Sequence, residues 1–237
     1  MRTIQGIFFD LGWTLETPKS GDWFLTDCFN EYVPEKVRLR ISPTDWQDAM
    51  QTGHAYMSRT HLLHGLQEEE DNFTVFYQII TSFFPETRLS ETDARAIAHD
   101  RTYNYDNYVP IESTIATLQK LKDMGYKLGV ISDTYPSVVP QLIDMGIDSF
   151  FDCFTYSCDL GVLKPNSRMY QDALEKMHLP ASSLLFVDDI PANLEAAASF
   201  GIHPVLSLAK PGSKPDERFP YINEPAEIFS LLKQYDR

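Results

Sequence analysis

Short apolar runs that end in polar residues recur along the chain and predict the strands of a parallel sheet. The first run extends from Ile4 to Phe9 and stops at Asp10, with only Gln5 and Gly6 interrupting it. Such a run is typical of a central strand that is buried on both faces. By the same pattern we predict further strands at 127–132, 152–157, 184–187 and 203–207.

Helical segments alternate with these later strands. We predict helices at 112–124, 136–145, 167–178, 191–200 and 224–235. Gly125, Gly146 and Gly201 follow three of them, at the position where glycine commonly ends a helix. Strict alternation of strand and helix predicts right-handed crossovers and a parallel sheet with helices on both faces, which is a three-layer α/β fold.

A different pattern fills the segment between the first strand and this alternating region. Residues 16–108 are predicted to be almost entirely helical, with Ser90 as a helix N-cap. An apolar stripe at helical spacing is formed by Phe73, Phe76, Tyr77, Ile80 and Phe84. We therefore expect a core domain made of 1–15 and 109–237, and an all-helical domain inserted at 16–108 on the side where Asp10 lies.

Composition narrows the possible classes of protein. The chain has 237 residues, of which 43% are hydrophobic, enough for one sizeable core and a smaller second unit. A formal net charge of -14 argues against nucleic acid or an anionic membrane as the main partner. No apolar run approaches the roughly 18 residues of a membrane span, and no signal peptide is recognisable. Cys28, Cys153 and Cys158 lack paired spacing, so we expect reduced thiols in a cytoplasmic protein.

Polar residues suited to phosphate chemistry stand where the predicted strands end. Asp10 follows the first strand. An aspartate there can simply cap a turn, but ligands of open α/β sheets also bind beyond the carboxyl ends of strands. Ser132, Asp133 and Thr134 end the next strand and precede a helix. A hydroxyl and backbone N–H groups at such a place bind an anion, although Ser and Thr also cap helices in general.

Two further candidates come later in the chain. Lys164 stands before a proline in the loop that opens the helix at 167–178, and would there be a fixed cation rather than an ordinary surface lysine. Asp188 and Asp189 follow the strand at 184–187. Adjacent carboxylates at the end of a buried strand repel each other unless they are neutralised or bind a metal. Hard oxygen ligands of this kind suit Mg²⁺.

This ordered set of Asp, Ser, Lys and Asp-Asp resembles the haloacid dehalogenase (HAD) superfamily. The resemblance spans essentially the whole chain, and the helical insertion matches that family's cap domain between its first and second motifs. The similarity is strongest at Val130-Ile131-Ser132, Gly161-Val162-Leu163-Lys164-Pro165 and Phe186-Val187-Asp188-Asp189. It implies a Rossmann-like core and a Mg²⁺-dependent phosphatase for a small phosphorylated metabolite, acting as a monomer or homodimer.

The resemblance also implies roles for the motif residues. Asp10 would attack phosphorus and form an aspartyl-phosphate, which water then hydrolyses. It would also ligate Mg²⁺, as would the backbone carbonyl of Gly12. Lys164 would be the second catalytic residue and neutralise the nucleophile and the phosphate oxygens. Ser132 would bind the transferring phosphoryl group.

The remaining implied roles concern the edges of the site. Asp189 is expected to be a direct metal ligand, and Asp188 is expected to be either a ligand or a support for one. Asn193 would support the carboxylates. Substrate contacts are expected for Asp133, Trp13, Gly12 and Lys164 as well as for Ser132.

The chain departs from the phosphatase pattern at Gly12, where that branch usually has a second Asp that protonates the leaving group. General acid–base catalysis contributes about 10²–10⁴-fold. Three interpretations remain open: substrates with good leaving groups, another acid such as Glu16 or a cap histidine, or a catalytically silent protein that binds a phosphorylated ligand or a partner. The dehalogenase branch lacks the paired acids, so Asp188 and Asp189 argue against dehalogenation.

Residues of the insertion are expected to decide the substrate. Its histidines are His54, His61, His64 and His99. One interpretation is that some of them, with Arg59, contact the substrate. The other is that they are solvated or buried polar residues of the cap. Trp13 and Trp23 are candidates to line the pocket next to Asp10, although aromatic residues more often pack.

Overall fold

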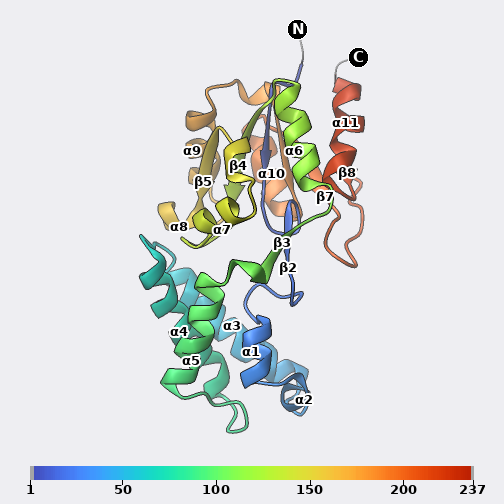
Figure 1. Ribbon diagram of the computed structural model, residues 1–237. Coiled ribbons are helices and arrows are strands. Elements are labelled where there is room, and N and C mark those ends of the chain that lie inside the picture. The colour runs from blue at the N-terminus through green and yellow to red at the C-terminus, as the bar shows by residue number, and fades with distance from the viewer. Residues whose placement is uncertain (1–2, 236–237) are drawn as a thin grey trace. The chain divides into compact units, whose positions relative to one another are not determined.

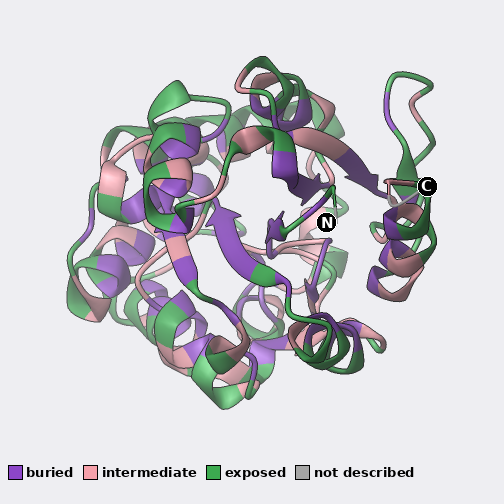
Figure 2. Ribbon diagram, turned by 90° about the horizontal axis from the view of Figure 1, so that it is seen from above, coloured by how far each residue is buried: buried purple, intermediate pink, exposed green. Residues whose placement is uncertain are grey.

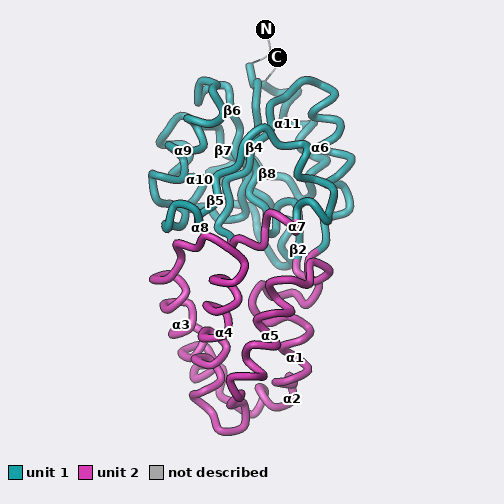
Figure 3. Tube along the Cα trace, turned by 60° about the vertical axis from the view of Figure 1, so that its left-hand side comes forward, with its two compact units in different colours: residues 1–17, 109–134, 142–237 teal, residues 18–108, 135–141 magenta. Residues whose placement is uncertain are grey.

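The computed structural model describes residues 3–235, which form two compact units. Unit 1 holds the described residues up to 17, together with 109–134 and those from 142 onward, and unit 2 holds 18–108 and 135–141 (Figure 3). The expected insertion at 16–108 corresponds to most of unit 2. The differences are Glu16 and Thr17, which belong to unit 1, and the segment 135–141, which follows a strand of unit 1 but packs with the helices of unit 2.

A six-stranded parallel sheet forms the centre of unit 1 and confirms the predicted α/β fold. Its order is β5-β4-β1-β6-β7-β8. The strands are β1 (Gly6–Phe9), β4 (Lys127–Ser132), β5 (Cys153–Tyr156), β6 (Leu184–Asp188), β7 (His203–Ser207) and β8 (Tyr221–Ile222). Phe8 of β1 is aligned with Gly129 of β4. A Cβ at Gly129 would lie 2.7 Å from the Phe8 ring, so glycine makes room for that side chain.

Helices cover both faces of this sheet. The helices that lie wholly in unit 1 are α6 (Thr114–Asp123), α8 (Ser157–Leu160), α9 (Ser167–Met177), α10 (Pro191–Ser199) and α11 (Ile228–Tyr235). A further helix, α7 (Val138–Asp144), begins in unit 2 and ends in unit 1. Phe8 and Phe186 pack with Tyr170 of α9 and Leu194 of α10 on one face. α6 lies on the opposite face (Figure 1). The strands of the sheet are buried, whereas the outer sides of the helices are exposed (Figure 2).

The order of the strands explains why functional residues gather at one place. β1 lies between β4 and β6, so the chain leaves β1 toward one edge of the sheet and later returns to its other side. Ligands of open α/β sheets bind at such a switch point, beyond the carboxyl ends of the strands. The residues that follow β1, β4 and β6 are therefore brought together.

Unit 2 is helical. Its helices are α1 (Asp27–Tyr32), α2 (Glu35–Arg38), α3 (Pro43–Arg59), α4 (Leu66–Ser82) and α5 (Glu91–Tyr103). The predicted stripe on α4 is confirmed for Phe73, Phe76, Tyr77 and Ile80, all of which are buried. Ser90 is the predicted N-cap of α5, and its hydroxyl accepts a hydrogen bond from the Asp93 N–H.

A buried charged group joins α4 to the segment 135–141. The Glu69 carboxylate accepts hydrogen bonds from the backbone N–H and the hydroxyl of Ser137, both at 2.6 Å, and from Arg101 Nη1 at 2.8 Å. The Arg101 guanidinium also lies 3.9 Å from the centre of the Phe73 ring. Charged groups this deeply buried are stable only when they are paired and hydrogen-bonded, as they are here.

Two short strands mark the places where the chain passes between the units. β2 (Glu16–Pro18) pairs with β3 (Tyr108–Pro110) in a separate two-stranded sheet. The structure also has 3₁₀ turns: η1 (Tyr105–Asn107), η2 (Asp148–Phe150), η3 (Ala181–Ser183) and η4 (Pro225–Glu227). Among residues 3–235, no helix combines the length and the apolar character needed to cross a membrane.

Candidate active site

Asp10 stands at the carboxyl end of the central strand. The residue directly follows β1, and its backbone N–H donates to the carbonyl of Val187 in β6 at 2.8 Å. The strands β1 and β6 are therefore still hydrogen-bonded to each other at Asp10. Asp188 follows Val187 and comes next to the same position on the neighbouring strand. Asp10 is 7% exposed and Asp188 is fully buried. In a site as buried as this, the pKa of each ionisable group depends strongly on the charges next to it.

Asp10, Asp188 and Asp189 form a cluster of carboxylates. Each offers an oxygen atom, and these three oxygens lie within 4.8 Å of one another. Among residues 3–235, no other group of three or more His, Cys, Asp or Glu side chains is close enough to hold a metal ion. The oxygen-only donor set fits Mg²⁺, which binds through one or two carboxylates and keeps several waters.

Burial, together with repulsion from neighbouring carboxylates, raises the pKa values of Asp10 and Asp189. Burial is the largest cause of the rise in the pKa of Asp189 to about 7, and the charges of Asp10 and Asp188 add to it. Burial likewise raises the pKa of Asp10, against the opposing charge of Lys164. Carboxylates whose pKa values are raised by burial and by one another are typical of functional sites and gain from a bound cation.

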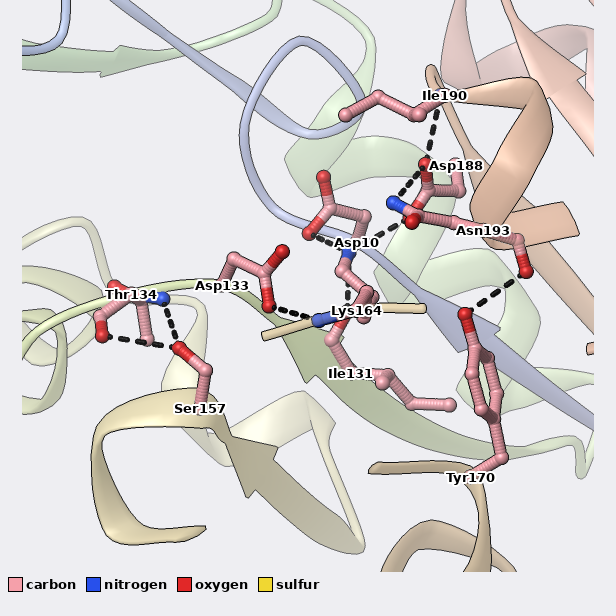
Figure 4. A network of polar contacts seen from close by, with 10 residues as sticks. All are labelled: Asp10, Ile131, Asp133, Thr134, Ser157, Lys164, Tyr170, Asp188, Ile190 and Asn193. Atoms are coloured by element: carbon pink, nitrogen blue, oxygen red, sulfur yellow. Dashed lines mark hydrogen bonds and ion pairs between the residues drawn. The ribbon is translucent and has the colours of Figure 1, made fainter. Parts of the chain in front are cut away.

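Lys164 lies at the centre of the polar network (Figure 4). Its Nζ donates to Asp10 Oδ1 at 2.8 Å, to Asp188 Oδ2 at 2.7 Å and to the carbonyl of Ile131 at 3.1 Å. Burial alone would lower the pKa of Lys164, but the carboxylates of Asp10, Asp188 and Asp133 raise it well above its usual range. The side chain is therefore a permanent cation bonded to the candidate nucleophile.

Ser132 and Asp133 stand at the end of β4, and Asp133 contacts the loop of Lys164. Asp133 Oδ1 accepts a hydrogen bond from the backbone N–H of Lys164 at 2.8 Å, which holds the lysine loop against β4. Ser132 is the last residue of β4 and is 3% exposed. Thr134, two residues after Ser132, donates its N–H to the Ser157 hydroxyl at 2.8 Å, so that α8 supports the same loop.

Asp188 is held by several donors of the protein itself. Its Oδ1 accepts from the backbone N–H of Ile190 at 2.7 Å, and Asn193 Nδ2 lies 3.0 and 3.1 Å from its two oxygens. The Tyr170 hydroxyl in turn donates to the carbonyl of Asn193 at 2.9 Å (Figure 4). Tyr170 was not among the residues expected from the sequence. Its only signal there is its place on the apolar face of the helix that follows Lys164.

The loop after Asp10 turns sharply. The carbonyl of Leu11 accepts from the N–H groups of Leu15 at 2.8 Å and Glu16 at 3.1 Å. Trp13 has φ +54°, a left-handed conformation that is uncommon for a bulky residue. Gly12, the residue in place of the second Asp, forms an isolated bridge with Glu16. Glu16 itself is buried in β2 and is not part of the carboxylate cluster.

The cap histidines occupy different surroundings within unit 2. His61 is buried, 5.3 Å from the Tyr135 ring centre, and burial lowers its pKa to about 4. His54 packs edge-on against Phe24 at 4.5 Å. His64 and His99 are polar residues of the surface, and the His99 ring lies 4.6 Å from that of Tyr103. Within the described residues, none belongs to a group that could hold a metal ion.

Comparison with known proteins decides the family. The model of the haloacid dehalogenase-like hydrolases matches residues 23–201. This chain belongs to that family. The HAD-like hydrolases include an (S)-2-haloacid dehalogenase of Pseudomonas putida that is 30% identical over 92% of this chain and 89% of its own length. The resemblance seen in the sequence is thus confirmed at the level of the family.

Phosphatases of the HAD family match over a shorter stretch. The GMP/IMP nucleotidase YrfG of Escherichia coli is 31% identical over 51% of this chain. The glyceraldehyde 3-phosphate phosphatase of Methanocaldococcus jannaschii is 33% identical over 52% of it. The chain matches 57% of the length of each of these two relatives.

Solved structures confirm the HAD fold. A dehalogenase crystal structure superposes with a TM-score of 0.68 at 18% identity, covering 98% of both chains. The HAD phosphatase from Thermococcus onnurineus gives a TM-score of 0.66, also at 18% identity, over 97% of this chain and 98% of its own. At this level of identity the superpositions establish the Rossmann-like architecture.

Proposed function

We propose that this HAD-like hydrolase is a Mg²⁺-dependent phosphatase that acts on a small phosphorylated metabolite. The observation that carries the proposal is the cluster of Asp10, Asp188 and Asp189 at the ends of β1 and β6, in which the buried Lys164 pairs with Asp10 and Asp188. Phosphoryl transfer requires positioned groups that cancel spread negative charge more than it requires covalent work by the protein. A lysine with a carboxylate cluster suited to a divalent cation meets that requirement.

The reaction assigns one task to each side chain. An oxygen of Asp10 attacks phosphorus while the bond to the leaving oxygen breaks, and water then hydrolyses the aspartyl-phosphate and releases inorganic phosphate. Lys164 holds the Asp10 carboxylate in place and balances its charge. Ser132 hydrogen-bonds the transferring phosphoryl group from the end of β4. When bound, Mg²⁺ supplies the positive charge that lets two anions approach each other.

The hydrogen bonds of Asp188 favour one of its two expected roles. Its oxygens already accept hydrogen bonds from Lys164, Ile190 and Asn193. We therefore assign Asp188 the role of supporting the metal ligands rather than of binding the metal directly. Asp10 and Asp189 are then the direct carboxylate ligands, together with the backbone carbonyl of Gly12. The raised pKa of Asp189, about 7, falls when a cation binds beside it.

The lack of an acid at position 12 to protonate the leaving group limits the range of substrates. Gly12 carries no acid, so an alkoxide leaving group would depart without help from that position. We therefore propose that turnover is faster for phosphate esters with good leaving groups. GMP, IMP and glyceraldehyde 3-phosphate are named in two of the relatives, which makes nucleoside monophosphates and triose phosphates the first compounds to assay.

The test is phosphate release with Mg²⁺ from these compounds and from an aryl phosphate, whose leaving group needs no proton, comparing the wild type with Asp10→Asn. We expect Asp10→Asn to abolish release, because the nucleophile is lost while the side chain keeps its shape. Asp144→Asn, at an exposed position of α7, is the matched control and should retain full activity. Release that persists in Asp10→Asn would contradict the proposal. Absence of release in the wild type would favour a protein that only binds a phosphorylated ligand.

A second candidate is removal of halide from a 2-haloacid. Two observations favour it: the match to (S)-2-haloacid dehalogenases over 92% of the chain, and the absence of a second Asp at Gly12. Against it, a haloacid carboxylate would approach a cluster of three carboxylates, of which Lys164 pairs with two. Halide release from (S)-2-chloropropionate in excess EDTA, lost in Asp10→Asn, would establish this reaction and exclude the requirement for Mg²⁺.

A further inference from the structure

Trp13 keeps a backbone conformation that a glycine would adopt without strain. Its φ of +54° lies in the left-handed region, which is costly for a bulky L-residue. The Trp13 N–H donates to the carbonyl of Glu16 at 2.9 Å, which holds the turn in this form. Strain retained beside a candidate nucleophile is a sign that the side chain has a function there.

Ser207 joins the Trp13 loop to the loop that follows β7. Its hydroxyl donates to the carbonyl of Trp13 at 2.9 Å and accepts, more weakly, from the N–H of Ala209 at 3.4 Å. Ser207 is 2% exposed, so this contact is protected from water. The two loops, almost two hundred residues apart in the sequence, are therefore held in a single arrangement.

A tight turn defines the position of Lys210 in the second loop. The N–H of Ser213 donates to the carbonyl of Lys210 at 3.1 Å. Pro211 and Gly212 occupy the middle of this turn, and Gly212 has φ +82°, as a type II turn requires. The Lys210 ammonium lies 6.0 Å from the centre of the Trp13 ring, at the limit of a cation–π contact.

No carboxylate of the described residues forms an ion pair with Lys210. Arg218 in the same loop is, by contrast, neutralised by Asp216 and Glu195. Lys164 is likewise occupied, by Asp10 and Asp188.

The charge of Lys210 nevertheless reaches the carboxylate cluster. Lys210 lies against Trp13, three residues after Asp10, and its charge acts on the Asp189 carboxylate as that of Lys164 does. A divalent cation bound at the cluster would take over the balancing of these carboxylates. The ammonium of Lys210 would then be available to an anion that arrives with the substrate.

We propose that Lys210, held over Trp13, binds a second anionic group of the substrate. The group is a carboxylate or a phosphate in the leaving-group part of a phosphomonoester, and the contact makes the enzyme prefer esters that carry this additional charge. The inference rests on the proposed phosphatase function. It assigns specificity to a loop of unit 1, independently of the residues of unit 2.

The test compares esters that differ only in the second charge. One pair is 3-phosphoglycerate and glycerol 3-phosphate, and the other is fructose 1,6-bisphosphate and fructose 6-phosphate. In Lys210→Gln we expect KM to rise about threefold to tenfold for the charged member of a pair, with kcat and the KM of the neutral member unchanged. The pair that responds identifies the second group as a carboxylate or a phosphate.

Two further variants serve as controls. Lys214→Gln removes an exposed lysine of the same loop and should change no KM, whereas Lys210→Arg should restore most of the preference. Equal changes for both members of each pair, or no change in either, would overturn the subsite and leave the phosphatase function standing. Failure of the wild type to release phosphate from any ester in an Asp10-dependent way would overturn both.

Discussion

The ammonium group of Lys164 neutralises part of the negative charge of the carboxylate cluster. Its side chain is 2% exposed and is paired with both Asp10 and Asp188. Asp188 is fully buried, so removing its counter-charge would leave an uncompensated carboxylate inside unit 1. At this position stability and the chemistry of the site depend on the same nitrogen atom.

Replacing Lys164 by methionine keeps most of the side-chain volume and removes the charge. We expect the free energy of unfolding, measured with urea, to fall by about 3–5 kcal/mol, as for other broken buried ion pairs. Lys176→Met is the matched control, because Lys176 pairs with Asp172 through a side chain that is 42% exposed. Such a surface pair contributes about 0–1 kcal/mol. Equal losses in the two variants would show that burial of the pair is unimportant.

Gly12 is a position at which a substitution should increase activity rather than reduce it. We expect Gly12→Asp to raise kcat for alkyl phosphates by about tenfold or more, because a positioned acid protonates a poor leaving group. Aryl phosphates leave readily without a proton and should gain much less. Gly12 is not among the described glycines with a positive φ, so aspartate can adopt its backbone conformation. The same increase for both classes of ester would contradict this account.

Among the elements, the connection between α3 and α4 of unit 2 carries a buried histidine whose protonation opposes folding. His61 follows α3 and is 3% exposed, and burial lowers its pKa from 6.5 to about 4. The folded protein keeps this imidazole neutral, whereas the unfolded chain takes up a proton below pH 6.5. The free energy of unfolding therefore has its full contribution from His61 above pH 6.5 and loses it as the pH falls toward 4.

Replacing His61 by phenylalanine should remove this part of the pH dependence. We expect the loss of unfolding free energy between pH 7 and pH 5 to be smaller than in the wild type by about 2 kcal/mol, as the shift in pKa requires. The measurement is urea denaturation at the two pH values. His64→Phe, three residues away and exposed, should keep the wild-type pH dependence. If His64→Phe reduced the pH dependence of unfolding as much as His61→Phe, burial of His61 would not be its cause.

Elements with a strong pattern were predictable, and those defined by distant contacts were not. β4 and β7 have the predicted bounds, because each ends in a run of buried residues, 128–132 in β4 and 205–207 in β7. β2, β3 and β8 contain three, three and two residues, too few to show a periodicity. The helix expected at 224–235 begins with the 3₁₀ turn η4, which Pro225 opens.

The same distinction applies to the site. Asp10, Asp188 and Asp189 could be expected to meet, because parallel strands end at the same edge of a sheet. The contact of Ser207 with Trp13 depends on how two distant loops pack, and no local pattern reports it. The support of Asn193 by Tyr170 was likewise hidden, since a buried tyrosine on a helix face resembles any other core residue.

At the scale of the whole molecule, a bound cation should stabilise the entire fold of unit 1. The chain carries a net charge of -14, and three of its carboxylates face one another in the cluster. Mg²⁺ at about 100 times its Kd adds about 2.7 kcal/mol to the free energy of unfolding by mass action. We expect the melting temperature of EDTA-treated protein to rise on addition of Mg²⁺.

The rise in melting temperature caused by Mg²⁺ should require the carboxylate cluster and should depend on pH. Because the pKa of Asp189 is about 7 without a cation, Mg²⁺ must displace a proton at lower pH, and the rise in melting temperature should be larger at pH 8 than at pH 6. Asp189→Asn should abolish the rise, whereas Asp144→Asn should not. An equal rise in both variants would mean that Mg²⁺ acts through general screening of charge.

The bond between Glu69 and Ser137 has a consequence for protein engineers who exchange domains between relatives. A chimera made by transplanting 18–108 alone would bring Glu69 and Arg101 into a host whose own sequence occupies the stretch at 135–141. The buried acid would then lack the serine that normally donates two hydrogen bonds to it. A functional graft must therefore carry two separate gene fragments, and the shorter one encodes only seven amino acids.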